Sequence, residues 1–172
     1  MAESYEMNPT ARLAIGTLGE PGNRTFYLQG INGLESLAVI IEKQQAYALA
    51  DAIDEMLNDL EERFELPPPR PSRISSRDLD LQLPVDASFR VAQMGLGYDE
   101  DHDMVLIAVQ ELTQEELFEP SIIRYWINRD QAAALSRHAR QIVASGRPTC
   151  ALCGKPITPG KACCPRVNGH LH

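Results

Sequence analysis

The chain has 172 residues, of which 44% are hydrophobic and 23% charged, a composition typical of a globular protein that can bury a core. Its net charge of −8 is uneven: the segment from Gly146 onward holds four basic residues and no acid, and subtracting this +4 leaves −12 for the first 145 residues. An acidic body would repel a phosphate backbone, so nucleic-acid binding is disfavoured.

The N-terminal residues Met1 to Pro9 contain acids and no apolar stretch, so no signal peptide is predicted. No apolar run has the length needed to cross a bilayer, and membrane insertion is not expected. All four cysteines fall between Cys150 and Cys164 instead of being spread through the chain as a disulfide framework. We therefore expect a cytoplasmic, reducing environment.

Three strands are predicted before the first helix: Arg12 to Leu18, Thr25 to Gln29 and Ser36 to Ile41. A turn-rich stretch, Gly19 to Asn23, separates the first two. Its glycines and Arg24 suggest a phosphate cradle as one interpretation, but the Gly-Lys-Ser/Thr ending is missing and no helix follows that would hold the anion. A hairpin turn is the better interpretation.

A long helix is predicted from about Glu42 to Arg63, because apolar residues recur at steps of three and four. The apolar stripe consists of Ala46, Leu49, Ala50, Ile53, Met56, Leu57 and Leu60. Most acidic residues of this segment lie off the stripe and indicate a solvated face, with a partner-docking surface as the alternative.

Leu66 to Pro71 ends this helix, since proline lacks an N–H and disfavours helix in the preceding residue. The proline-, serine- and arginine-rich stretch that continues to Pro84 shows no clear period, so residues 66–87 are predicted to form a joint between two halves. The expected role of the joint is that of a stiff spacer, with a polyproline ligand for a partner domain as the alternative.

The second half follows the same order, with strands at Ser88 to Met94, Met104 to Gln110 and Ser121 to Ile127. Asn128 can cap the helix that follows, Gln131 is at the reciprocal capping-box position, and Gly146 ends the helix. The apolar stripe of this helix consists of Ala132, Leu135, Ala139, Ile142 and Val143.

The two halves also share a short sequence. Ile-Glu-Lys-Gln-Gln-Ala-Tyr-Ala-Leu (Ile41 to Leu49) and Ile-Asn-Arg-Asp-Gln-Ala-Ala-Ala-Leu (Ile127 to Leu135) agree in Ile, Gln, two Ala and Leu. Each copy joins the end of a strand to the start of a helix. We therefore predict an α+β fold of two pseudo-symmetric strand-strand-strand-helix repeats, at about residues 10–65 and 88–145, with Leu49 and Leu135 buried at equivalent positions.

One acidic loop of the body partly matches the sequence pattern of a calcium-binding loop. Asp99, Asp101 and Asp103 match the first ligands of an EF-hand loop, but Met104 and Gln110 stand where that loop needs glycine and glutamate. We expect an inert hairpin tip.

No catalytic motif is found in the body. His138 lies at the edge of an apolar stripe, where a packed histidine is more common than a catalytic base. If the protein acts on a substrate or senses a small molecule, we expect the site between the two halves. Arg24, Tyr27 and Arg124 are then the first residues to inspect.

The tail, residues 146–172, has the form of a zinc knuckle. Cys150 and Cys153 are three positions apart and can reach one ion from a tight turn, and Gly154 lets the backbone fold back towards the sulfurs. Two more cysteines and two histidines follow in the tail: Cys163, Cys164, His170 and His172. About ten residues between the ligand pairs suits a short zinc ribbon.

Other uses of these thiols must be weighed. A redox Cys-x-x-Cys normally begins a helix that lowers the thiol pKa, whereas this pair follows a helix and precedes prolines. A structural disulfide conflicts with a reducing environment. Zinc is therefore the predicted cofactor, and redox-active or incidental thiols are the alternatives.

Four stretches resemble a known family: Gly16 to Gln29, Glu42 to Gln45, Gly95 to Asp99 and Cys164 to His170. They are similar to a bacterial family, found chiefly in actinobacteria and chloroflexi, that is catalogued as the domain of unknown function DUF3090. The resemblance covers nearly the whole chain. Genes of that family often lie beside a lipid-kinase-like protein and a histidine-phosphatase-like protein, which implies a small functional module but no particular activity.

The resemblance also bears on the metal ligands. The family pattern has a histidine two residues before its last cysteine, and here that position is Ala162. With Cys150, Cys153 and Cys164 as ligands, the fourth is His170 or Cys163. We favour His170, because the adjacent cysteines 163 and 164 point their side chains apart.

We therefore expect a non-enzymatic, zinc-stabilised interaction or accessory protein. The duplicated body would be its scaffold, and the basic tail would dock a protein partner. An enzyme or small-molecule sensor with its site between the repeats is the alternative function. Neither the partner nor the oligomeric state is predicted.

Overall fold

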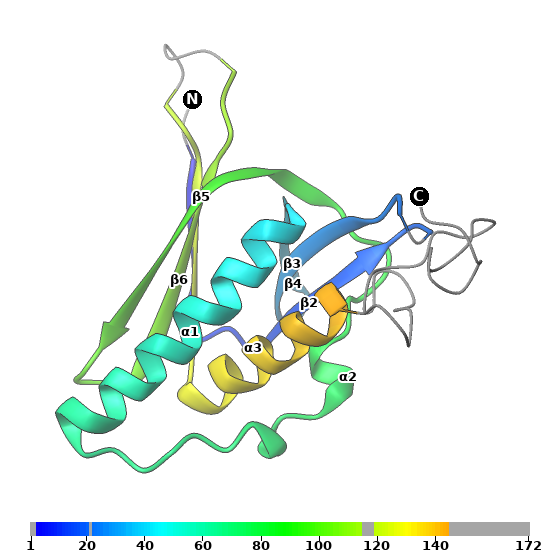
Figure 1. Cartoon of the computed structure of the whole chain (residues 1–172). Helices are drawn as coiled ribbons and strands as arrows, with labels where there is room; N and C mark the ends of the chain where they lie inside the picture. Colours follow the sequence, from blue (N-terminus) through cyan, green and yellow to red (C-terminus); the bar gives the residue numbers. More distant parts are fainter. Residues whose placement is uncertain (1–2, 21, 115–118, 145–172) are drawn as a thin grey trace, which may run out of the picture.

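The computed structural model describes residues 3–20, 22–114 and 119–144. Within these residues the chain folds into a seven-stranded sheet with two long helices packed against it (Figure 1). The strands are β1 (Ser4–Met7), β2 (Arg12–Leu18), β3 (Thr25–Asn32), β4 (Glu35–Ile41), β5 (Ala87–Asp99), β6 (Met104–Glu111) and β7 (Ile122–Ile127). The helices are α1 (Lys43–Phe64), α2 (Ser76–Leu79) and α3 (Arg129–Ala144), and η1 (Pro71–Arg73) is a 3-10 turn. The predicted α+β class is confirmed.

The sheet joins two antiparallel meanders, β2–β3–β4 and β5–β6–β7. The strand order is β1-β7-β6-β5-β4-β3-β2. The meanders meet where β4 and β5 pair in parallel, and β1 pairs in parallel with the far edge of β7. The sequence predicted six of these strands and missed β1.

β5 is longer than predicted because it changes neighbours along its length. Ala87 and Arg90 pair with β4, and the register with β6 shifts between Val91 and Gln93. After this irregularity the strand leaves β4 and continues to Asp99 beside β6. Bulges of this kind bend a strand and redirect its edge.

The turn-rich stretch after β2 is a hairpin, as predicted. β2 and β3 pair in antiparallel fashion from Arg12 opposite Ile31 to Leu18 opposite Thr25. Gly19 has a φ of +107°, and a Cβ at this position would lie 2.7 Å from the carbonyl oxygen of Asn23. The turn therefore requires glycine here.

Both long helices begin with the same reciprocal hydrogen bonding. In α1 the backbone N–H of Glu42 donates to Oε1 of Gln45 at 2.7 Å, and in α3 the N–H of Asn128 donates to Oε1 of Gln131 at 2.8 Å. The backbone N–H of Gln131 donates to Oδ1 of Asn128 in return, at 2.7 Å. The capping box predicted for α3 is confirmed.

The predicted apolar stripes face the interior. Leu49 of α1 is 3% exposed and Leu135 of α3 is 0% exposed, and each follows a strand of the sheet. The predicted burial of this pair is confirmed. α1 and α3 also pack against each other across the curled sheet (Figure 1).

The curl of the sheet brings strands that are not neighbours into contact. Tyr125 of β7 is fully buried, and its hydroxyl donates to the carbonyl oxygen of Leu37 in β4 at 2.9 Å. A Cβ on Gly30 of β3 would lie 2.5 Å from Cε1 of this ring. The absence of a side chain at Gly30 therefore makes room for the tyrosine.

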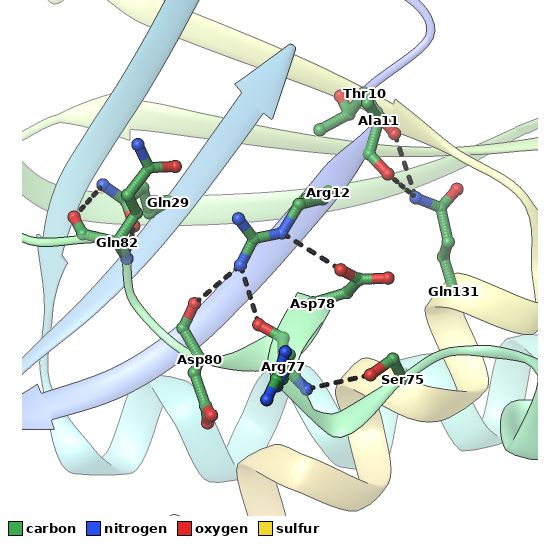
Figure 2. Close-up of polar contacts among 10 residues, drawn as sticks. All are labelled: Thr10, Ala11, Arg12, Gln29, Ser75, Arg77, Asp78, Asp80, Gln82 and Gln131. Atoms are coloured by element: carbon green, nitrogen blue, oxygen red, sulfur yellow. Dashed lines mark hydrogen bonds and ion pairs between the residues drawn. The ribbon is translucent and has the colours of Figure 1, made fainter. Parts of the chain in front are cut away.

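The joint packs on the body, which corrects the prediction that it is a spacer. A Cβ on Gly16 of β2 would lie 2.9 Å from Cγ of Leu81, so the two segments are in close contact. Gln29 of β3 donates from Nε2 to the carbonyl oxygen of Gln82 at 3.1 Å and accepts its N–H at 2.8 Å (Figure 2). These contacts fix the segment in place.

Candidate functional site

Each long helix binds backbone carbonyl groups of the other half through the glutamine at its start. Nε2 of Gln45 donates to the carbonyl oxygens of residues 91 and 92 in β5, at 3.1 and 3.4 Å. Nε2 of Gln131 donates to the carbonyl oxygens of residues 10 and 11, just before β2, at 2.9 and 3.2 Å (Figure 2). Two clefts result, one between α1 and β5 and one between α3 and β2.

The joint covers the cleft between α3 and β2. Ile74 and Leu79 of the joint line this cleft together with Leu13 and Gln131, and a volume of about 20 Å³ remains. Leu79 is 8% exposed. Apolar side chains of the chain itself therefore fill the cleft.

Arg12 of β2 binds this cover. Its Nη2 donates to the carbonyl oxygens of Arg77 and Asp80 at 2.8 and 3.1 Å, and its Nε lies 3.4 Å from Oδ1 of Asp78 (Figure 2). The carbonyl of Arg77 also accepts the backbone N–H of Asp80 at 3.3 Å, so the guanidinium adds a second donor there and binds the carbonyl of Asp80 beyond the end of α2. The side chain of His138 is 17% exposed, in line with the predicted packing. Its Nε2 lies 3.8 Å from Oδ1 of Asp80, which is too far for a hydrogen bond.

The cleft between α1 and β5 has no such cover among the residues that the structure describes. It is an open groove of about 680 Å³, called the α1–β5 groove below. Its apolar lining includes Ala48, Ala52 and Met56 from the helix and Met94 and Gly95 from the strand. Both alanines and the glycine are exposed.

The polar lining of the groove is acidic. Asp59 pairs with Arg63 at 3.2 Å, and the amide of Gln45 is occupied in binding β5. The exposed side chains of Glu55 and Gln93 make no hydrogen bond or ion pair with the described residues. The ionisable lining groups are thus two carboxylates from one helix, so the local field favours a basic ligand.

β5 borders the groove with an unpaired edge. Five consecutive residues, 92–96, line the groove, and since side chains of a strand alternate between faces, the strand edge borders it. From residue 93 to 99 the strand pairs with β6 on one side and, among the described strands, with nothing on the other. Such an edge leaves backbone N–H and C=O groups free for an added polypeptide.

The three residues singled out for a site between the halves lie elsewhere. Arg124 of β7 donates from Nη1 to Oγ of Ser4 at 2.9 Å, which links β7 to β1. Tyr27 lies in β3 opposite Gly16, and Nε of Arg24 is buried without a hydrogen-bond partner in the described part of the chain. None of the three lines the α1–β5 groove.

The acidic loop ties the β5–β6 hairpin to the start of α3. Oδ1 of Asp103 accepts hydrogen bonds from Nε of Arg129 at 2.8 Å and from the hydroxyl of Tyr98 at 2.6 Å. Oδ2 of Asp99 lies 2.7 Å from Nδ1 of His102. Two of the three aspartates therefore have protein partners.

This network shifts the pKa values of its members, including those of Tyr98 and Asp103. Burial, together with the hydrogen bond to Asp103, raises the pKa of Tyr98 to about 12. Burial acts to raise the pKa of Asp103, but the hydrogen bonds from Arg129 and Tyr98 outweigh it and lower that pKa below its usual value. These are the properties of a structural ion pair, because each partner is already satisfied.

The predicted zinc ligands lie outside the residues that the structure describes: Cys150, Cys153, Cys163, Cys164 and His170. Within residues 3–20, 22–114 and 119–144, no three His, Cys, Asp or Glu side chains are grouped to hold a metal ion.

Comparison with known proteins places the chain in a family. A family model described as "Protein of unknown function (DUF3090)" matches residues 5–164. The chain belongs to the DUF3090 family. The resemblance predicted from the sequence is therefore confirmed. No curated protein and no solved structure matches this DUF3090 chain.

The DUF3090 match runs from β1 through α3 and onward to Cys164, so it includes both clefts and all four cysteines, while His170 lies beyond it. In the described part of this DUF3090 chain, no helix is long and apolar enough to cross a membrane.

Sequence reasoning did not find the α1–β5 groove. The available signal was a pair of alanines, Ala48 and Ala52, one turn apart beside the apolar stripe of α1. Alanine is also the best helix former, so the pattern alone does not distinguish a groove from a solvated face.

Proposed function

We propose that this DUF3090 protein is a non-enzymatic, zinc-stabilised interaction or accessory protein whose α1–β5 groove receives a protein partner. The observation that carries the proposal is the groove itself. It is open, has a volume of about 680 Å³, and is lined largely by small and apolar side chains beside an unpaired strand edge. Surfaces of this kind bind polypeptide through main-chain hydrogen bonds and a few side-chain contacts.

The proposal includes an internal duplication with pseudo-twofold symmetry. It is supported by the matching contacts of Gln45 and Gln131, by the shared order of the two meanders, and by the burial of Leu49 and Leu135. In this arrangement α1 with β5 corresponds to α3 with β2. The α1–β5 groove would then lie between the repeats.

An enzyme or small-molecule sensor at the same groove is the second candidate. Its volume favours this, since pockets for small molecules measure about 300–1,000 Å³. The lining favours a polypeptide instead. Glu55 and Asp59 are both exposed and Asp59 is paired with Arg63, whereas acid–base catalysis uses carboxyl groups whose environments tune them apart.

The tail would add a second contact. Cys150, Cys153 and Cys164, with His170 or Cys163, would hold one zinc ion, and the spacing of the first two supports this. Zinc would order a basic segment of +4 beside an acidic body. The lipid-kinase-like and histidine-phosphatase-like proteins encoded nearby in the family are the first partners to test.

The test is affinity purification of the tagged full-length protein from its native host, with quantitative detection of these two neighbours. We expect one of them in stoichiometric amount with the wild type and with Gln44→Arg, and its loss with Ala52→Arg. Gln44 is an exposed residue of α1 outside the groove, so it controls for added charge on the same helix. Recovery of neither neighbour, or equal recovery with both variants, would contradict the proposal.

A further inference from the structure

The two clefts are built in the same way, but the helix residues that line them differ in solvent exposure. Ala134 stands three residues after Gln131 and is 3% exposed. Ala48 stands three residues after Gln45 and is exposed. Because both glutamines make the same contacts, the two alanines occupy corresponding places on their helices.

The strands differ in the same way. Counted from the carbonyl groups that the glutamines bind, Leu13 and Ala14 of β2 correspond to Met94 and Gly95 of β5. Leu13 and Ala14 are buried, at 3% and 0% exposure, whereas Met94 is half-buried and Gly95 exposed. The joint accounts for this difference, since it fills the cleft beside β2 and leaves the cleft beside β5 open.

The charges of the two clefts are opposite. The covered cleft contributes the guanidinium of Arg12, and the joint meets it with the carboxylate of Asp78. The α1–β5 groove contributes the free carboxylate of Glu55 and the carboxylate of Asp59, which is paired with Arg63. The joint matches the charge of its cleft with an acidic side chain. A segment that matches the charge of the α1–β5 groove must therefore be basic.

We infer that the α1–β5 groove binds a short basic segment of a partner protein, built like the Ile74–Leu79 stretch of this chain. Two apolar side chains five positions apart enter the groove, and Lys or Arg replaces the aspartates. Gln93, at the position that Arg12 occupies in β2, donates to carbonyl groups of the segment. This inference rests on the proposed function and names the class of partner.

Other occupants fit less well. A second copy of this chain would bring a body that carries −12 against an acidic groove. The chain's own basic tail has a suitable charge, and its Leu152 and Ile157 are five positions apart. Between them, however, Cys153 is a predicted zinc ligand and Pro156 lacks the N–H of a helical turn. A partner segment satisfies charge and spacing together.

The probes are two labelled synthetic peptides that copy residues 72–83. One carries the native sequence, and the other carries Asp78→Lys and Asp80→Lys. Each is titrated by fluorescence anisotropy into the full-length protein. We expect the basic peptide to bind at least about tenfold more tightly than the native one, with an affinity that falls as salt rises.

Variants locate the binding. Ala52→Arg is expected to weaken binding of the basic peptide by at least about tenfold, and Glu55→Gln by about two- to fivefold. Gln44→Arg and Glu62→Gln alter exposed residues of the same helix outside the groove and leave binding unchanged. Thermal melts establish that each variant is folded. Equal binding of both peptides, or unchanged binding to folded Ala52→Arg, would overturn the inference.

A cross-link distinguishes the occupants. p-Benzoylphenylalanine in place of Gln93 is expected to cross-link to the basic peptide. Cross-links to residues 145–172 of the same chain, or to a second copy, in the presence of saturating peptide would overturn the inference. These cross-links would contradict the inference but not the proposed function, which is tested by co-purification with a neighbour. If the peptide binds but no neighbour co-purifies, only the proposed partner is contradicted.

Discussion

The ring of Tyr125 in β7 occupies the space in which a side chain on Gly30 of β3 would lie. A Cβ on Gly30 would be 2.5 Å from the tyrosine Cε1 and 3.2 Å from the sulfur of Met7. β7 and β3 are separated by three strands in the sheet, so the contact crosses the interior. It fixes how far the sheet can curl, and therefore how the two helices sit over their strands.

Gly30→Ala should destabilise the protein by about 1–3 kcal/mol, because the methyl group has no room beside the ring. Urea unfolding gives the free energy. Gly95→Ala serves as the matched control, since a Cβ there meets nothing within 4 Å. Combining Gly30→Ala with Tyr125→Leu should cost less than the sum of the two single changes; strict additivity would show that the contact is unimportant.

Gln45→Ala and Gln131→Ala should each cost about 1–3 kcal/mol. Each change removes the reciprocal bond at a helix start and leaves two backbone carbonyls of the opposite half without their donor. Gln44→Ala removes a neighbouring exposed amide and should stay within about 0.5 kcal/mol of wild type. If only one of the two helix-start glutamines mattered, the correspondence between the halves would fail.

The pH dependence of stability should report Asp103. Its pKa is lowered in the folded protein, so its contribution is present above the unfolded value of about 4 and is lost as the pH falls through the lower folded value. Asp103→Asn should cost about 1 kcal/mol at pH 7, and this difference should shrink below about pH 4. Asparagine tolerates the positive φ of 51° at this position.

Asp101→Asn is the control for that experiment. The side chain of Asp101 is exposed and makes no hydrogen bond with the described residues, so its removal should leave the curve of stability against pH unchanged. An equal effect of the two substitutions would mean that general charge repulsion, and not the bond to Arg129, sets the pH dependence.

One zinc ion per chain is expected in protein purified without added metal, measured by mass spectrometry. Cys150→Ala, Cys153→Ala and Cys164→Ala should each lose it. His170→Ala should also lose it, with Cys163→Ala retaining most of the metal. Full zinc in His170→Ala with loss in Cys163→Ala would reverse the order of the two candidates. Stoichiometric zinc in Cys150→Ala would exclude the site. Chelation should leave the melting of the α+β body unchanged, because residues of the described body form a continuous hydrophobic core.

Local patterns predicted the elements well. The period of α1, the capping box at Asn128 and the turn at Gly19 depend on residues close together in the sequence, and all three are present. The sequence did not predict β1, because Ser4–Met7 has one buried residue, Met7, and no alternation of buried and exposed positions. The strand is held instead by its parallel pairing with β7.

Contacts between distant segments escaped sequence reasoning. The joint has the composition of a spacer, yet Leu79 and Leu81 pack on β2 because a cleft and a glycine happen to face them. The α1–β5 groove was not predicted from the sequence either, because it also depends on contacts between distant segments. The joint covers the cleft between α3 and β2, whereas no described segment covers the cleft between α1 and β5. The periodicity of a single helix or strand does not reveal such a difference.

The central claim, that the α1–β5 groove receives a basic polypeptide, is tested most directly by amide hydrogen exchange of the full-length protein with and without the basic peptide. The expected result is slower exchange at residues 93–96 of β5, whose edge gains a partner, with no change at residues 13–16 of β2. Protection of β2 instead of β5, or no protection at a saturating concentration of peptide, would contradict the claim.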